Sequence, residues 1–234
     1  MKPIFRKVAG GLAIGAGAAA AGYAAVVAWN RLRYGHVTLD GQPDHASLLD
    51  HFIANPEVVA SHQITINAPP EVVLDAAKQL ELLDSPMVRG LFKLRELALG
   101  GEPDTRPHPG SLYDQMLSIG WVVLAETPGR EIVFGAVTKP WEAAPAFRSI
   151  PAAEFAAFSE PGNVKIAFAL RAEPNDNEGA VFWTETRAIA TDAEARAKFR
   201  RYWSYVAPGV HLIRLAMLQP VKCEAERRVY GYVA

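Results

Sequence analysis

The chain has 234 residues, of which 50% are hydrophobic and 21% charged, and this suits one globular domain with an appendage. Its formal net charge of -1 excludes attraction to nucleic acid by the surface as a whole, so we expect no nucleic-acid partner. A single cysteine, Cys223, excludes an intrachain disulfide framework and a multi-cysteine metal site.

The first predicted element is an uncharged apolar segment. No residue between Lys7 and Arg31 is charged, and residues 8–29 would form a helix about 33 Å long, enough for a bilayer core of about 30 Å. We interpret residues 1–33 as a membrane anchor that crosses the bilayer once. The basic residues before the span outnumber those after it, which favours a cytoplasmic N-terminus and an extracytoplasmic domain. A cleaved signal peptide and a helix buried in a soluble core are the alternatives.

A linker and the first part of a folded domain follow the anchor. Residues 34–59 form a polar linker with one short predicted helix near 46–53. Alternating side chains at 62–66 then predict a strand. Helical spacing predicts helices at 71–80 and 86–99.

Two pairs of strands follow a Gly- and Pro-rich loop at residues 100–111. The segments "GWVVLAET" and "REIVFGAV" flank Pro128-Gly129, a turn signal, and predict a hairpin. The segments "NVKIAFALRAE" and "GAVFWTETRAIAT" predict a second hairpin with a longer loop. Alternation in the third of these strands predicts an inward set of apolar side chains: Val164, Ile166, Phe168 and Leu170.

The last predicted element is a long amphipathic helix. It begins at Thr191, because Thr191 and Glu194 fit a capping box. Apolar residues then recur every three or four positions from Ala195 to Met217. Pro208 stands in the middle of this pattern and predicts a bend, across which the apolar stripe keeps its phase.

The order of elements predicts an α+β fold for residues 60–230. Helices segregated from antiparallel strands are typical of that class. A curved antiparallel sheet whose inner face is closed by one long, kinked C-terminal helix is the helix-grip arrangement. We expect the bent helix to close an apolar cavity.

Four stretches of the chain carry a family resemblance. They are "HQITINAPPEVVLDAA", "ETPGREIVFGAV" followed by Trp141, "TETRAIATD" and "RRYWSYVAPGVHLIR". Together, from Leu48 to Arg228, they resemble an uncharacterised bacterial branch of the SRPBCC superfamily, the START-like group that includes the birch-pollen allergen and polyketide cyclases. The resemblance implies a cavity between sheet and C-terminal helix that holds lipids, sterols, polyketides or other apolar molecules, and it brings no assigned reaction. Pro220 departs from the pattern, which leaves open how regular the last helix is past Gln219.

One predicted strand also carries polar candidates. Trp183, Glu185, Arg187 and Ile189 alternate and therefore share one face. If that face lines the cavity, Glu185 and Arg187 would be a buried pair that orients a polar head group or acts in acid–base catalysis. If it is the outer face, the two are ordinary partners of charged residues on the neighbouring strand, and this is the interpretation we favour.

Large apolar and aromatic side chains are the main predicted ligand contacts. A fully packed core would show the same stripe, and the resemblance is what implies a cavity instead. None of the six histidines is spaced as a metal-ligand pair, so we expect no metal and no cofactor. The predicted ligand-binding residues are Phe168, Trp183, Phe199, Tyr202, Trp203, Val206, Trp141 and Arg187.

Three functions are compatible with this sequence. The first, which we favour, is a membrane-anchored START-like domain that binds an apolar small molecule or lipid as a carrier or sensor. The second is a polyketide cyclase- or dehydratase-like enzyme that uses the same cavity, with Glu185 as its acid–base group. The third is a scaffold without a cavity, in which Gly11 and Gly15 let two anchor helices pair as a weak homodimer.

Overall fold

The fold is built on a five-stranded antiparallel sheet. A computed structural model describes residues 21–34, 47–81, 89, 90, 93, 100 and 110–231. The strands lie in the spatial order β1-β5-β4-β3-β2. Their bounds are β1 (Val58–Ile66), β2 (Val122–Thr127), β3 (Glu131–Thr138), β4 (Val164–Pro174) and β5 (Ala180–Ala190). The α+β class, the antiparallel sheet and both predicted hairpins are confirmed.

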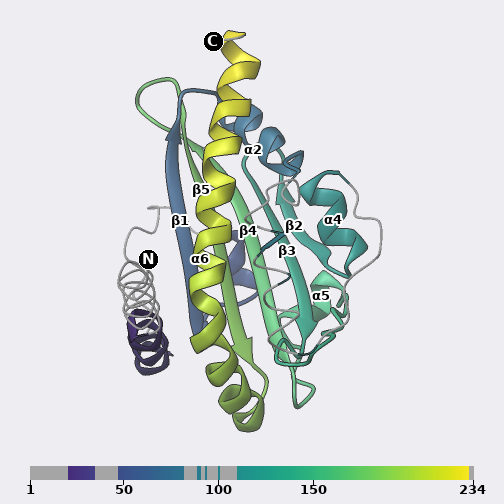
Figure 1. Ribbon diagram of the computed structural model, residues 1–234. Helices are drawn as coiled ribbons and strands as arrows, with labels where there is room; N and C mark the ends of the chain where they lie inside the picture. The colour runs from purple at the N-terminus through teal and green to yellow at the C-terminus, as the bar shows by residue number, and fades with distance from the viewer. Residues whose placement is uncertain are drawn as a thin grey trace, which may run out of the picture.

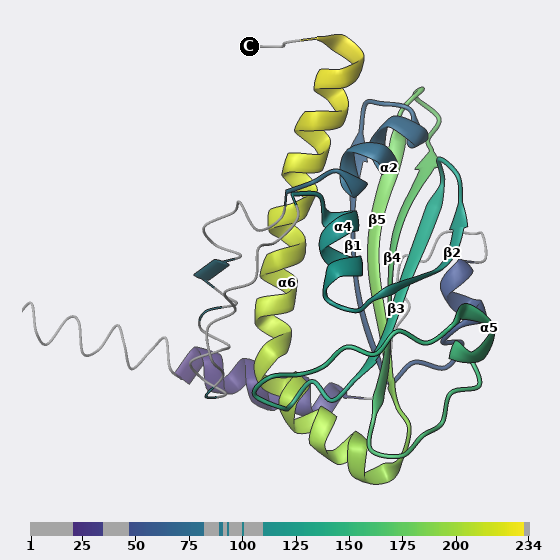
Figure 2. The ribbon, with the colours of Figure 1, turned by 90° about the vertical axis from the view of Figure 1, so that its right-hand side faces the viewer.

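Helices cover both faces of the sheet. The labelled helices are η1 (Leu48–His51), α2 (Pro70–Lys78), α4 (Leu112–Ser118), α5 (Ala152–Phe155) and α6 (Ala193–Tyr230). The long α6 lies along β5 and β1 (Figure 1). Figure 2 shows α6, α2 and α4 on one face, which we call the inner face, and η1 and α5 on the other, the outer face.

The register decides which side chains meet each layer. Phe168 of β4 pairs with Thr186 of β5 and with Phe134 of β3. Side chains alternate along a strand, so the even-numbered residues of β1, β3, β4 and β5 face inward and the odd-numbered residues face outward. The predicted inward set of β4 is confirmed, since Phe168 and Leu170 pack with residues of α6 and α2.

The outer face is a packed layer under η1 and α5. Leu49 of η1 and Phe155 of α5 are both fully buried there, against Val133 of β3. Gly135 also faces this layer, and a Cβ at that position would lie 2.4 Å from Cδ1 of Leu124. Glycine is therefore required beneath Leu124, and the outer layer is closed at this point.

The start of α6 differs from the predicted capping box. Asp192 is the N-cap, and its carboxylate accepts a hydrogen bond from the backbone N–H of Ala195 at 2.9 Å. The hydroxyl of Thr191 instead donates to the carbonyl of Asn163 at 2.9 Å. The capping-box prediction was therefore wrong: Asp192 satisfies the first turn, while Thr191 ties β5 to the start of β4.

The helix α6 is continuous over 38 residues and contains both Pro208 and Pro220. Its first turns run at an angle to the remainder (Figure 2), in agreement with the predicted bend. It continues regularly past Gln219 to Tyr230. Pro220 lies on an exposed side of the helix. Water can therefore hydrate the carbonyl that its missing N–H leaves free.

The N-terminal helix packs beside α6. Residues 21–33 are helical, and the hydroxyl of Tyr23 donates to the carbonyl of Tyr205 at 2.8 Å. Two guanidinium nitrogens of Arg200 donate to the carbonyl of Arg31, at 3.0 and 2.7 Å.

Within the described ranges, no helix combines the length and the hydropathy needed to cross a membrane. Residues 1–20 of the predicted anchor lie outside those ranges, as do most of 86–99 and of the loop at 100–111.

Candidate ligand-binding site

The apolar side chains of the inner face form two separate clusters. One, the α2 cluster, joins α2 and the second half of α6 to the sheet and includes Leu74, Phe134, Phe182, Met217 and Val221. The other, the Phe199 cluster, lies at the start of α6 and includes Val58, Val164, Ala188, Ala195 and Phe199. Both pack against the same face of the sheet, so the inner core is divided in two.

Two large side chains of β4 lie where the clusters meet. Ile166 packs against the Phe199 cluster, and Phe168 packs against the α2 cluster. Both side chains are partly exposed although β4 is the central strand, whereas Ala167 and Ala169 on its outer face are buried. Accessible apolar surface therefore remains on the inner face, in the middle of the sheet.

Small residues flank Ile166 on the neighbouring strands, whereas Phe168 stacks on Phe134. Ile166 pairs with Ala136 on β3 and with Ala188 on β5. Across from the sheet, α6 buries only the small side chains of Ser204 and Ala207 between Phe199 and Arg214. The fully buried side chains of this part of α6 are therefore short, and larger ones such as Trp203 and Val206 are half-buried there.

Arg214 of α6 reaches the sheet at this position. Only 5% of the residue is exposed. Its Nη1 donates to the hydroxyl of Thr184 at 2.7 Å, and its Nη2 donates to the hydroxyl of Thr186. Its guanidinium carbon lies 5.7 Å from the ring centre of Phe168, within the range of a cation–π contact. We call Ile166, Phe168, Thr186 and Arg214 the central patch.

The charge of Arg214 is held in an unusual environment. Burial lowers the pKa of Arg214 to about 10, against an opposing effect of Glu185, so the group stays cationic at neutral pH. Among the described residues no carboxylate forms an ion pair with Arg214, and its Nε has no hydrogen-bond partner. Burying an unpaired cation opposes folding. The stability of the fold alone therefore does not account for Arg214.

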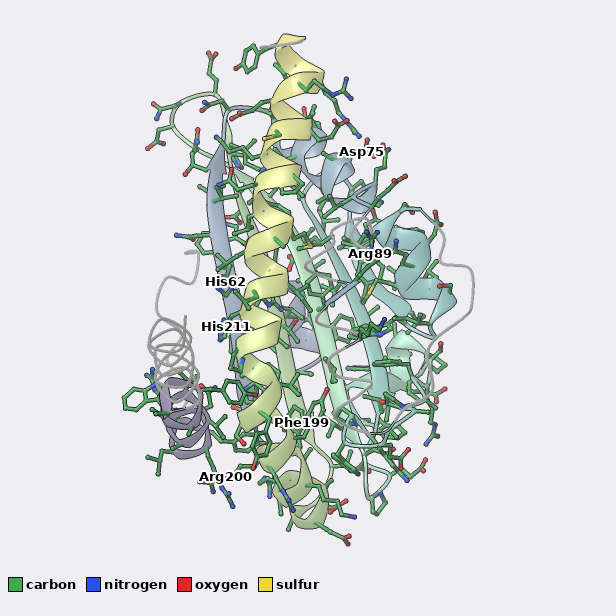
Figure 3. The ribbon with its side chains drawn as sticks, viewed as in Figure 1. His62, Asp75, Arg89, Phe199, Arg200 and His211 are labelled. Atoms are coloured by element: carbon green, nitrogen blue, oxygen red, sulfur yellow. The ribbon has the colours of Figure 1, made fainter. Side chains whose placement is uncertain are left out.

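Two histidines lie next to this cation, between β1 and α6 (Figure 3). The ring centres of His62 and His211 are 5.2 Å apart. Burial lowers the pKa of both imidazoles, and the charge of Arg214 lowers each further. Nδ1 of His62 is buried and has no partner among the described residues. The imidazoles are therefore held neutral beside a charged guanidinium.

The structure places Glu185 and Arg187 on the outer face, away from the central patch. Arg187 is 1% exposed, and its Nε donates to Glu185 at 2.6 Å. Its Nη1 donates to Asp50 of η1 at 2.5 Å and to the carbonyl of Ile53 at 3.1 Å. The favoured outer-face interpretation agrees with this position. The pair differs from ordinary surface partners, because it is a buried ionic cluster that holds η1 against the sheet.

The other predicted ligand contacts are also divided between the outer and inner faces of the sheet. Trp183 shares the outer face with Arg187 and so is not part of the inner surface. The inner face gathers Trp141, Tyr202 and Trp203 around the Phe199 cluster, with Phe199 and Trp203 ring centres 6.0 Å apart. Val206 is half-buried on α6. The structure thus brings together the predicted aromatic residues of α6, Trp141 and the inner face of β4.

Arg214 is the site residue that sequence reasoning missed. It belongs to the quoted stretch "RRYWSYVAPGVHLIR", but it was not among the predicted contacts. A signal was present, since Arg214 stands four residues after Val210 and three before Met217, in phase with the apolar stripe. A lone cation on a buried stripe is the pattern that could have identified it.

A surface groove of about 380 Å³ lies elsewhere, between α2 and the last turns of α6. Ala76, Leu80 and Pro220 form apolar parts of its lining, and Glu81 and Arg228 are charged parts of it. This groove is distinct from the predicted position between the sheet and the middle of α6. No cluster of metal-ligating side chains is present in the portion of the chain that the structure describes.

Comparisons with known proteins give low similarity. No family model matches the chain, and no curated protein matches it. A hypothetical protein from Helicobacter pylori is 8% identical, with a TM-score of 0.38, over 80% of this chain and 99% of that chain. The Zhui aromatase/cyclase from Streptomyces is 15% identical, with a TM-score of 0.30, over 74% of this chain and 96% of that chain. The Mll3558 protein from Rhizobium loti is 12% identical, with a TM-score of 0.30, over 70% and 96%. The family resemblance stays a prediction, and the function proposed below rests on the residues of this chain.

The buried cluster of Glu185 predicts a structural rather than a chemical role. We expect Glu185→Gln to lower the free energy of unfolding by about 1–3 kcal/mol, because the charge beside the buried Arg187 is lost. Binding of an apolar probe at the inner face should not change. Urea unfolding and probe titration measure the two effects. As a control, Glu126→Gln breaks an exposed ion pair with Lys78 and should cost under about 1 kcal/mol. A Glu185→Gln chain of normal stability that no longer binds the probe would contradict this role.

The two neutral imidazoles predict a loss of stability in mild acid. In the unfolded chain a histidine titrates near pH 6.5, and the lowered pKa values of His62 and His211 mean that the folded chain binds fewer protons just below that pH. The free energy of unfolding should therefore fall as the pH drops from about 7.5 to 5.5. In urea unfolding at several pH values, His62→Gln should show a smaller fall, whereas His51→Gln, on the exposed end of η1, should behave as the wild type. Equal slopes in all three chains would refute the assignment.

Proposed function

We propose that this protein binds an apolar small molecule or lipid between the inner face of the sheet and α6, and acts as a carrier or sensor. The observation that supports the proposal most directly is the partial exposure of Ile166 and Phe168 on the central strand. A central strand covered on both faces normally buries such side chains. Here an apolar guest can bury them instead.

The energetics favour a guest of this kind. Removing apolar surface from water stabilises a complex by about 25 cal/mol per Å². Aromatic rings lie near the exposed surface, because Trp141 and Trp203 pack against the same Phe199 cluster as Ile166. Rings that are already ordered lose little conformational freedom on binding. The site therefore combines exposed apolar surface with a preformed aromatic wall.

The cyclase-like alternative loses the group on which it was based. Glu185 is on the outer face and binds Arg187, so it does not reach a molecule held under α6. The binding proposal needs no proton transfer and uses only the surface around Ile166 and Phe168. It is therefore the function that the geometry supports best.

We also propose that residues 8–29 tether this domain to a membrane. The segment carries no charge, and its last residue, Trp29, has 59% of its surface exposed. Arg33 lies over the Trp29 ring at 5.3 Å, an arrangement suited to an interface between lipid and water. Arg200 binds the last turn of this helix and would hold the α6 end of the domain near that surface.

The binding proposal predicts that filling the central patch blocks the guest. Ile166→Phe adds a ring to the open surface, and we expect the affinity for the neutral apolar probe N-phenyl-1-naphthylamine to fall at least about tenfold. The free energy of unfolding should change by less than about 1.5 kcal/mol. Ile189→Phe is the matched control, because Ile189 is a partly exposed isoleucine on the outer face of the next strand. If both variants bind the probe as the wild type does, the guest is not held at the central patch.

The tether predicts how the full chain fractionates. After alkaline carbonate washing, which removes peripheral proteins, we expect the chain to remain in the membrane pellet. Its intact mass should include residues 1–33, since an uncleaved anchor is retained. Release into the supernatant would contradict a spanning anchor. A mass lacking the first segment would indicate a cleaved signal peptide.

A further inference from the structure

We infer that the bound molecule carries an anionic head group, a carboxylate or a phosphate on an apolar chain, and that Arg214 binds this group. The inference deepens the proposed function and rests on it. It assigns Arg214 a direct contact with the ligand and limits the ligand class to anionic amphiphiles.

The hydrogen bonds of Arg214 leave one edge of its guanidinium, at the buried Nε, without an acceptor among the described residues. A guanidinium has five N–H donors in a planar arrangement. Thr184 accepts from Nη1, Thr186 accepts from Nη2, and Nε has no partner. The Nε–H and the neighbouring Nη–H form a parallel pair of donors, the geometry that binds a carboxylate or phosphate with two hydrogen bonds. The two threonines fix the plane of this pair beforehand.

The charges around Arg214 also favour an anion. Its two acceptors are neutral hydroxyls, and the carboxylate that affects it, Glu185, lies across the sheet and binds Arg187. The charge of Arg214 also acts on two imidazoles, that of half-buried His62 and that of the more exposed His211, and both are neutral at pH 7. An entering anion would therefore pair with a cation that is already desolvated and would meet no competing carboxylate from these neighbours.

The apolar part of the ligand has a place beside the charge. The guanidinium lies over the ring of Phe168, and Phe168 is partly exposed together with Ile166, two residues along the same strand. Ile166 packs against the Phe199 cluster, and so do the half-buried Trp141 and Trp203. A chain that starts at Arg214 can thus run over apolar side chains toward the first turns of α6. A single anionic group with an apolar tail fits this order of side chains.

A structural role for Arg214 gives a different expectation for stability. If Arg214 served only the fold, Arg214→Met would leave the chain less stable. On the present inference the cation lacks a counter-ion until a ligand binds, so Arg214→Met should unfold at the same or a higher urea concentration than the wild type. Met is unbranched like the aliphatic part of Arg, so the packing of that part of the side chain is retained.

Displacement of a neutral probe tests the inference. The full chain, freed of bound lipid and loaded with N-phenyl-1-naphthylamine, is titrated with myristate, tetradecyl phosphate and 1-tetradecanol, which share one alkyl chain. In the wild type we expect at least one of the two anions to displace half of the probe at a concentration at least about tenfold lower than the alcohol needs. A hydrogen bond to a charged group is strong in a desolvated site. The anion that does so identifies the head group.

Variants separate the two proposals. In Arg214→Met the three competitors should displace the probe at equal concentrations, each compared with that variant's own probe affinity. Arg214→Lys, which keeps the charge without the planar donor pair, should show a smaller preference than the wild type. Arg201→Met removes an exposed cation of the same helix and should keep the full preference. Equal displacement by all three in the wild type, or a preference that survives in Arg214→Met, would overturn the role of Arg214 and leave the binding proposal intact. Failure of the wild type to bind the probe would overturn both.

Discussion

The pairing of Phe168 on β4 with Thr186 on β5 determines which side chains face α6. With this register Phe168, Thr186 and Thr184 point to the inner face, where Arg214 can reach them. The same register sends Arg187 outward, to the ionic cluster under η1. A shift of one residue would exchange the two sets and place an ion pair under α6. The separation of the central patch from the structural ionic cluster depends on this one alignment.

Each face of the sheet buries one arginine, and the two arginines have different surroundings. On the outer face Arg187 pairs with two carboxylates and a carbonyl, so its charge is compensated although its Nη2 has no partner among the described residues. On the inner face Arg214 has only hydroxyls and the face of a ring. The same type of side chain is thus buried twice with different degrees of compensation. Arg214, which has no carboxylate partner among the described residues, lies beside the exposed apolar surface, and on our proposal the ligand supplies its counter-ion.

Much of the fold could be predicted from the sequence because period and turn signals are local. The alternation around Phe168 and the Pro128-Gly129 turn predicted the hairpins, and the stripe from Ala195 to Met217 predicted α6. The pairing of β1 with β5 joins segments more than 100 residues apart and has no such signal. The continuation of α6 through Pro220 depends on solvent at an exposed position, which the residue type does not reveal.

The candidate site was harder to predict than the fold. The face of Glu185 depends on a one-residue register, and alternation alone leaves both faces open. The contribution of Arg214 depends on what surrounds it in space, because the same residue on an exposed side of α6 would be an ordinary surface cation. Tertiary contacts, rather than residue type, therefore distinguish Arg214 from its neighbours on the helix.

The central claim is that apolar surface at Ile166 stays open to a guest under α6. Methyl NMR of the full chain labelled at isoleucine Cδ1, titrated with N-phenyl-1-naphthylamine, tests it directly without altering any side chain. We predict that the methyl signal of Ile166 shifts with increasing probe, while that of Ile189 on the outer face stays in place. A saturable shift of Ile189 with Ile166 unmoved would contradict the claim.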